Sequence, residues 1–144
     1  ALDGSKFTIL RPASSYKHLL ERAGLLLEAW GLWQKRDDAI RNLSYGHQRQ
    51  VEVLLAVAQK PRLLLLDEPT GGLSPGETAE IVSIIRSLPS DMAIMLIEHD
   101  MDAAFELADT VTVLHLGKVL ADGPGDEVRR DPRVQEIYLG SGEA

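Results

Sequence analysis

The stretch Leu63–Thr70, with the sequence LLLLDEPT, decides the fold of this chain. Its four consecutive leucines predict a short strand that is buried on both faces, as in a parallel sheet. Two carboxylates follow, Asp67 and Glu68, and burying a carboxylate is costly unless a cation or hydrogen-bond donors compensate it. Open α/β sheets bind ligands at the carboxyl ends of their strands, so Asp67 is a candidate Mg²⁺ ligand and Glu68 a candidate partner of a reactive water. The alternative is a strand that ends in a polar turn at Pro69, because such runs are not rare.

The composition fits one domain, or a piece of one, and excludes several classes of function. The chain has 144 residues, and 44% of them are hydrophobic, which is usual for a protein with a core. A net charge of −7 argues against a nucleic-acid partner. The absence of cysteine excludes disulfides, thiolate metal sites and cysteine nucleophiles. With no apolar run long enough to span a membrane and no visible signal peptide, a cytoplasmic location is expected.

Breakers and hydrophobic spacing predict alternating helices and strands along the rest of the chain. The first helix should begin at a cap on Ser14 or Ser15 and end near Trp30, after an irregular start over residues 1–13. Further helices are expected over residues 44–59, 75–88, 101–108, 126–130 and 132–138, and buried or paired strands over 92–97, 110–116 and 119–121. The last two strands should form a hairpin. This order is typical of a parallel α/β sheet.

The segment 43–50, with the sequence LSYGHQRQ, opens a helix that has a good N-cap in Ser44. The free amides of a helix start attract anions, and Gly46 has no side chain to keep a phosphate away. His47 adds a polar group in the first turn. Taken alone, the segment is more simply explained as an ordinary capped helix.

Two more positions carry a signal. Ser74 and Glu77 form a capping box, with Pro75 at the first helical position. His99 follows the strand over 92–97, as Asp67 ends the leucine strand, and two strands that end in polar residues at one edge of a sheet indicate a site there. The alternative is that His99 only caps the next helix.

Together these motifs resemble those of ABC-type ATPases. Residues 43–47 are similar to the family's signature motif, 65–70 to its Walker B motif with the catalytic Glu, 72–74 to its D-loop, and His99 to its switch histidine. The match is good from residue 43 to about 122. The Ser-Tyr-Gly form of the signature and the ending VQEIYLG at 134–140 resemble ATPase subunits of branched-chain amino acid and urea importers.

The resemblance implies a P-loop NTPase-type α/β fold with a parallel sheet, of which this chain is the C-terminal part. Residues 1–42 would belong to the helical subdomain and residues 43–144 to the ATPase core. The family hydrolyses ATP with Mg²⁺ between two facing ATPase subunits, identical or different. It does so at the inner face of the cell membrane, where permease subunits hold it. The solute is set by those partners.

The resemblance implies a role for each residue that matches one of the family's motifs. Asp67 would bind Mg²⁺, Glu68 would polarise the attacking water, and His99 would contact the γ-phosphate. A second set of residues would contact the nucleotide: Ser44, Gly46, His47 and Ser74. Within this set, Ser44 and Gly46 would contact the γ-phosphate of the nucleotide that the other subunit holds. Position 47 is usually Gln in the family, and we expect His there to tune the contact, because imidazole still donates a hydrogen bond.

One departure is large: no G-x-x-x-x-G-K-[ST] loop occurs in the 144 residues, and Gly4-Ser5-Lys6 does not supply one. The chain alone is therefore expected to be inactive, although its parent protein would hydrolyse ATP. The chain does not begin with Met, and both a naturally short chain and a truncation stay open. Two other functions also remain: a non-enzymatic module that keeps the fold, and an ABC ATPase of DNA maintenance. The sequence has neither the long charged coiled coils nor the basic surface of the latter.

The missing loop also affects the sheet. In ABC-type ATPases the strand that carries the loop lies between the strands that correspond here to 92–97 and 110–116. We expect the strand 63–67 to pair with 92–97, whose far edge would then be open. The chain should either pair 92–97 with 110–116 directly or recruit a second copy. Asp67, Glu68 and His99 should cluster at one edge, away from Ser44 and Gly46.

Overall fold

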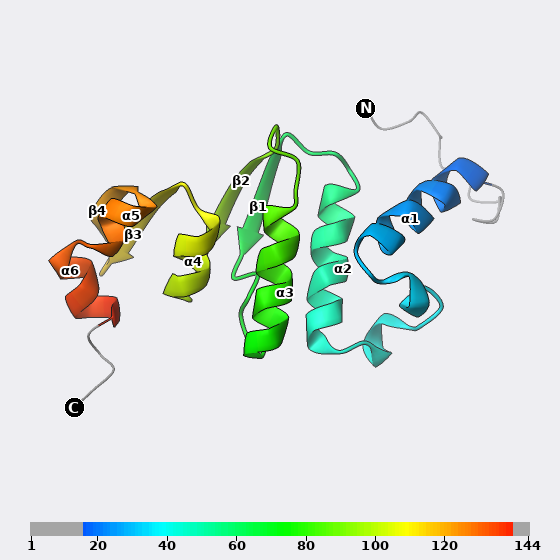
Figure 1. The fold of residues 1–144 in the computed structure, drawn as a ribbon, viewed down its shortest axis with the longest axis horizontal. Helices are drawn as coiled ribbons and strands as arrows, with labels where there is room; N and C mark the ends of the chain where they lie inside the picture. The colour runs from blue at the N-terminus through cyan, green and yellow to red at the C-terminus, as the bar shows by residue number, and fades with distance from the viewer. Residues whose placement is uncertain (1–15, 140–144) are drawn as a thin grey trace. The chain divides into compact units, whose positions relative to one another are not determined.

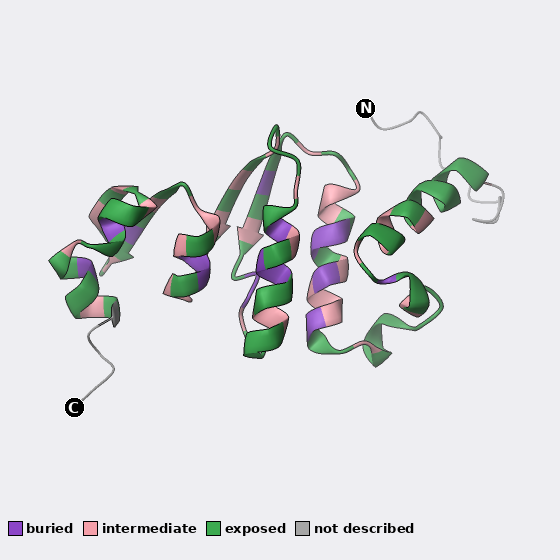
Figure 2. Cartoon of the chain, viewed as in Figure 1, coloured by how far each residue is buried: buried purple, intermediate pink, exposed green. Residues whose placement is uncertain are grey.

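A computed structural model describes residues 16–139, which divide between Leu43 and Ser44 into two compact units (Figure 1). The described part of the first unit contains α1 (Lys17–Ala29) and the single turns η2 (Trp33–Lys35) and η3 (Ile40–Asn42). Figure 2 shows no buried residue on α1. Tyr16 is its N-cap and makes no capping hydrogen bond, while the predicted caps Ser14 and Ser15 lie outside the described residues.

The second unit begins with α2 (Tyr45–Val57), β1 (Leu63–Asp67), α3 (Pro75–Arg86) and β2 (Ala93–Ile97). Both predicted caps are confirmed: the Ser44 side chain accepts from the His47 amide, and Ser74 with Glu77 forms the capping box of α3. α3 packs against both α2 and α4 (Met101–Leu107). The buried apolar residues of α2 and α3 form this part of the core: Val53, Leu54, Ile81, Val82 and Ile85.

β1 and β2 pair in parallel, from Leu63 opposite Ala93 to Asp67 opposite Ile97. The prediction that β1 is buried on both faces is wrong, because Leu64 is 3% exposed and its neighbour Leu65 is 65% exposed. Successive side chains of a strand point to opposite faces. No described segment covers the second face of β1 and β2, and we call its apolar residues the open face: Leu63, Leu65, Met95 and Ile97.

β3 (Thr110–His115) and β4 (Lys118–Pro124) form the predicted hairpin, a separate antiparallel sheet with a bulge after Val113. The prediction that β3 continues the parallel sheet, or pairs directly with β2, is wrong. The two-residue connection Leu116-Gly117 lets β3 pair with β4, its neighbour in the sequence. β1 and β2 pair with each other instead. Among residues 16–139, the far edge of β2 has no partner strand.

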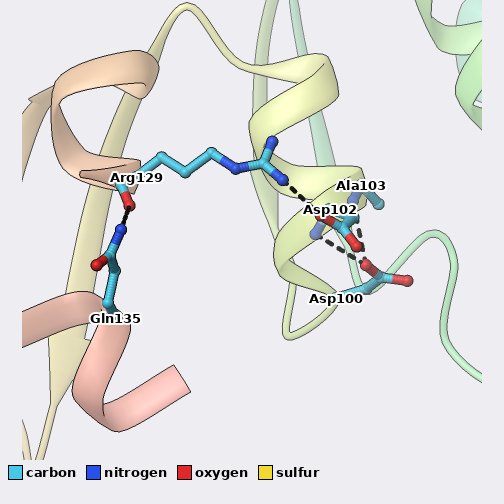
Figure 3. A network of polar contacts seen from close by, with 5 residues as sticks. All are labelled: Asp100, Asp102, Ala103, Arg129 and Gln135. Atoms are coloured by element: carbon cyan, nitrogen blue, oxygen red, sulfur yellow. Dashed lines mark hydrogen bonds and ion pairs between the residues drawn. The ribbon is translucent and has the colours of Figure 1, made fainter. Parts of the chain in front are cut away.

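Three short elements close the second unit: α5 (Gly125–Arg129), α6 (Pro132–Val134) and a single π-helical turn, η4 (Gln135–Leu139). The predicted helix over 132–138 is confirmed, although it is α-helical only over α6 and continues as the π-helical turn η4. Val113, Val128 and Val134 form a small core beneath them. Figure 3 shows the polar contacts alongside, in which Arg129 pairs with Asp102 of α4 at 3.0 Å and accepts from Gln135 at 3.2 Å through its carbonyl.

Candidate functional site

The carboxyl ends of β1 and β2 bring together three of the residues that the sequence singles out. Asp67 is the last residue of β1, Glu68 follows it, and His99 comes two residues after β2 ends. His99 Nδ1 lies 3.4 Å from Glu68 Oε1, and both side chains are exposed. Asp67 is opposite Ile97 in the register, on the open face. The Glu68 carboxylate and the His99 imidazole therefore meet at the edge where parallel sheets place their ligands, and Asp67 is next to Glu68 in the sequence.

Glu68 has a left-handed backbone conformation, with φ at 45°, which L-residues adopt only at a cost. Its backbone groups are held from three sides. Its N–H donates to the Ile97 carbonyl at 2.8 Å, and its carbonyl accepts from the Gly71 amide at 3.0 Å. The same carbonyl accepts from Arg49 Nη2 of α2 at 3.3 Å. The strained turn is thus fixed by β2 and by α2.

Thr70 anchors the other end of this turn. Its amide donates to Glu98 Oε1 at 2.8 Å, and its hydroxyl donates to the same oxygen at 2.7 Å. Glu98 is the residue between β2 and His99. The segment that bears Glu68 is therefore bound to the segment that bears His99 through both backbone and side-chain contacts.

The second predicted group, at the start of α2, is arranged differently from the expectation. Ser44 Oγ lies 2.7 Å from His47 Nδ1 and accepts from the His47 amide at 3.2 Å. The Gly46 amide is not free for an outside anion, because it donates to Glu77 Oε1 at 3.2 Å. A Cβ at Gly46 would lie 2.6 Å from that oxygen. The room that the absent side chain leaves is filled by a carboxylate of α3, an anion at a helix start.

Glu77 joins this helix start to Ser74. The Ser74 amide and hydroxyl donate to Glu77 Oε2 at 3.1 and 2.8 Å. The hydrogen bonds from Ser74 and the weaker effect of the Gly46 amide hold the pKa of Glu77 below its ordinary value of 4.5. Within residues 16–139, the Ser44 side chain bonds to His47, and the amides of Gly46 and Ser74 donate to Glu77 rather than to Glu68 or His99.

The exposed carboxylates of Asp67 and Glu68 are the oxygen ligands that Mg²⁺ prefers. In the part of the chain that the structure describes, no three His, Cys, Asp or Glu side chains come together to hold a metal ion. The residues therefore fit Mg²⁺ only as it binds beside substrate phosphates, with one or two carboxylates and the remaining ligands from substrate and water. No described helix is both long and apolar enough to cross a membrane.

Three residues of this region make contacts that the sequence analysis did not predict: Arg49, Glu77 and Glu98. A signal existed for Glu98, which follows a strand directly beside His99. Glu77 was expected to cap α3 only, and its second contact with Gly46 joins residues 31 positions apart. Arg49 is 19 positions from Glu68, and no local pattern predicts such a pairing.

Known proteins with similar sequences match most of this chain. A family model described as "ABC transporter" matches residues 6–71, and one described as "Branched-chain amino acid ATP-binding cassette transporter" matches residues 118–144. The high-affinity branched-chain amino acid transport ATP-binding protein LivG of Salmonella typhimurium is 39% identical over 123 residues, which are 84% of this chain and 48% of that protein. BraF of Pseudomonas aeruginosa, of the same description, is 36% identical over 88% of this chain and 50% of its own length.

A solved structure agrees with these sequences. An ATP-binding cassette of an ABC transporter, in its ADP conformation, superimposes with a TM-score of 0.75 at 28% identity. The superposition covers 94% of this chain and 54% of the other. The chain spans about half the length of the curated relatives that it matches.

Proposed function

Since the chain belongs to the ABC transporter family of ATP-binding proteins over the residues that these models match, we propose that it is the C-terminal portion of an ATPase subunit of an importer. Its ATPase would serve uptake of branched-chain amino acids or a related small solute, which is the activity in the names of the relatives LivG and BraF. The observation that carries the proposal is the 3.4 Å contact between Glu68 and His99 at the ends of two parallel strands.

Each residue at this edge would have a separate task. Asp67 would hold Mg²⁺, which supplies neutralisation of phosphate charge when it is bound. Glu68, with an exposed carboxylate, would accept a hydrogen bond from the attacking water and orient it. His99 would donate a hydrogen bond to the terminal phosphate. Because its ring lies beside the Glu68 carboxylate, it would also hold Glu68 in position.

The start of α2 would act on a different nucleotide. Ser44 and Gly46 would contact the terminal phosphate of ATP held by a second ATPase subunit, and His47 would tune this contact. Ser74 would also contact the nucleotide. Because Glu77 occupies the Gly46 amide, this carboxylate would have to leave before a phosphate could bind there. Residues 1–42 would belong to the helical subdomain. Permease subunits would hold the assembly at the inner face of the membrane, as a peripheral cytoplasmic protein.

The test is ATP hydrolysis by the full-length protein that contains this chain. Glu68→Gln keeps the size of the side chain but removes the negative charge, so hydrolysis should fall by roughly 1,000-fold or more while ATP still binds. Glu106→Gln on α4, also an exposed carboxylate, is the matched control and should keep the activity. Equal activity of wild type and Glu68→Gln would contradict the proposal.

A non-enzymatic interaction module is the second candidate, and the missing phosphate loop is the observation that favours it. The 144-residue chain alone should neither hydrolyse ATP nor bind it tightly, because the loop supplies most phosphate contacts. A full-length protein that neither binds ATP tightly nor turns it over would support this second candidate.

A further inference from the structure

We propose that Glu98 is a positioning residue that fixes the turn Asp67–Thr70 to the end of β2 and so sets the distance between Glu68 and His99. This inference rests on the function proposed above and adds a residue to it. Glu98 touches neither reacting group. It acts through Thr70, the far end of the turn in which Glu68 lies.

The contact has the properties of a strong anchor. One carboxylate oxygen, Glu98 Oε1, accepts from both the amide and the hydroxyl of Thr70, at 2.8 and 2.7 Å. Hydrogen bonds to an ionised acceptor are shorter and stronger than those between neutral groups. Thr70 is only 5% exposed, so water competes little for these donors.

The anchor belongs to a set of three successive contacts along one short segment. The Ile97 carbonyl holds the Glu68 amide at 2.8 Å, Glu98 holds Thr70, and His99 lies 3.4 Å from the Glu68 carboxylate. The left-handed backbone of Glu68 persists only where the surroundings determine it. Ile97 fixes the beginning of the turn and Glu98 its end, so loss of Glu98 frees the end while the β-sheet remains.

The other oxygen of Glu98 argues against a purely structural explanation. Glu98 Oε2 is buried and has no hydrogen-bond partner among residues 16–139. A buried unpaired oxygen is unfavourable for folding, so its presence calls for an explanation, and a role at the neighbouring site supplies one. A Gln at this position would still present one acceptor to Thr70, and its amide nitrogen would replace one unpaired atom by another.

The first test compares Glu98→Ala with Glu98→Gln in ATP hydrolysis by the full-length protein. Misplacing a reacting group by about 1 Å can cost roughly 100-fold, so Glu98→Ala should lower kcat by about that factor and leave KM for ATP unchanged. Glu98→Gln should keep most of kcat. Thr70→Val should resemble Glu98→Ala, whereas Thr70→Ser keeps the hydroxyl and should resemble wild type. The double variant Glu98→Ala/Thr70→Val should be no slower than either single variant, because both remove one anchor.

The second test does not depend on activity. Amide hydrogen exchange at Thr70 in the nucleotide-free protein should become faster in Glu98→Ala and stay near wild type in Glu98→Gln, because the Thr70 amide donates to Glu98. Glu106→Ala, which removes a surface ion pair with Arg86, is the control and should leave both the exchange at the turn and kcat unchanged.

The outcomes separate the two proposals. If wild type has no ATPase activity, the proposed function fails, and the exchange measurement alone decides the role of Glu98. Unchanged exchange at Thr70 in Glu98→Ala overturns the inference, as does an equal loss of kcat in the Ala and Gln variants. If Glu98→Ala does not fold, Thr70→Val against Thr70→Ser provides the same comparison.

Discussion

Glu68 and Leu116 have nearly the same unusual backbone conformation, with φ at 45° and 49°, for different reasons. Glu68 is held by β2 and by Arg49 of α2, contacts that come from distant parts of the sequence. Leu116 lies in the two-residue turn between β3 and β4, next to Gly117 with φ at 74°. Positive φ at both residues is the geometry that hairpin turns favour. The strain at Leu116 is thus a local turn property, and the strain at Glu68 belongs to the site.

Leu116→Asn should stabilise the chain. Asn adopts the left-handed conformation more easily than Leu, which costs about 1 kcal/mol there, and Leu116 is too exposed to lose much packing. Urea unfolding should show a free energy of unfolding higher by about that amount. Leu116→Gln is the matched control, because it is polar without the same backbone preference. An equal gain in both variants would show that side-chain polarity, and not backbone strain, limits this turn.

At the scale of elements, one carboxylate joins α2 and α3. Glu77 caps α3 through Ser74 and accepts from the Gly46 amide at the start of α2. The pKa of Glu77 is lowered in the folded chain, first by the Ser74 amide. Its contribution to stability is therefore complete above the ordinary value of 4.5 and is lost as pH falls through the folded value. Acid should loosen the helix start before it melts the core.

Gly46→Ala tests this junction. The added Cβ would lie 2.6 Å from Glu77 Oε1, so the carboxylate must move and its pKa should rise toward 4.5. NMR titration of the Glu77 carboxyl carbon measures the change. Gly76→Ala is the control, since it makes the same substitution next to Glu77, and beyond the two chain neighbours and the backbone of α3 no atom lies within 4 Å of the new Cβ. That variant should leave the pKa of Glu77 unchanged, and a matching rise in both variants would refute the account.

The elements themselves were predictable where the signal is local. Ser44, and Ser74 with Glu77, begin their helices where the sequence predicts, because a cap and its partner lie three residues apart. The contact between Glu68 and His99 also follows from the sequence, since both residues follow strands that pair in parallel. The junction of Gly46 with Glu77 was not predictable, because it depends on how two helices pack, which neither helix pattern determines.

At the scale of the whole molecule, the distribution of exposed apolar residues reflects a sheet of only two parallel strands. Each residue of the open face, Leu63, Leu65, Met95 and Ile97, is at least half exposed. Helix periodicity and strand alternation predict which apolar residues share a face, but the burial of that face also requires a neighbouring segment. The chain has about half the length of its curated relatives, and no described segment covers this face.

The open face and the free edge of β2 should make the isolated chain associate with a second copy. Of the two outcomes expected for this edge, direct pairing of β2 with β3 does not occur, because the two strands lie in separate sheets, and association remains as a prediction. An exposed apolar strand edge is a template for pairing, and Lys is a residue that blocks such pairing. Sedimentation velocity should show a concentration-dependent dimer for the wild-type chain and a monomer for Met95→Lys.

Leu55→Lys distinguishes this edge from general surface hydrophobicity. Leu55 on α2 is 61% exposed, almost the same as Met95 at 60%, but it lies on a helix and offers no unpaired backbone groups. The Leu55→Lys chain should therefore dimerise like wild type. A wild-type chain that stays monomeric at every concentration would rule out association through β2. Loss of the dimer in both Lys variants would trace it to scattered apolar contacts, because Met95, unlike Leu55, lies on a strand with an edge whose N–H and C=O groups lack a partner among residues 16–139.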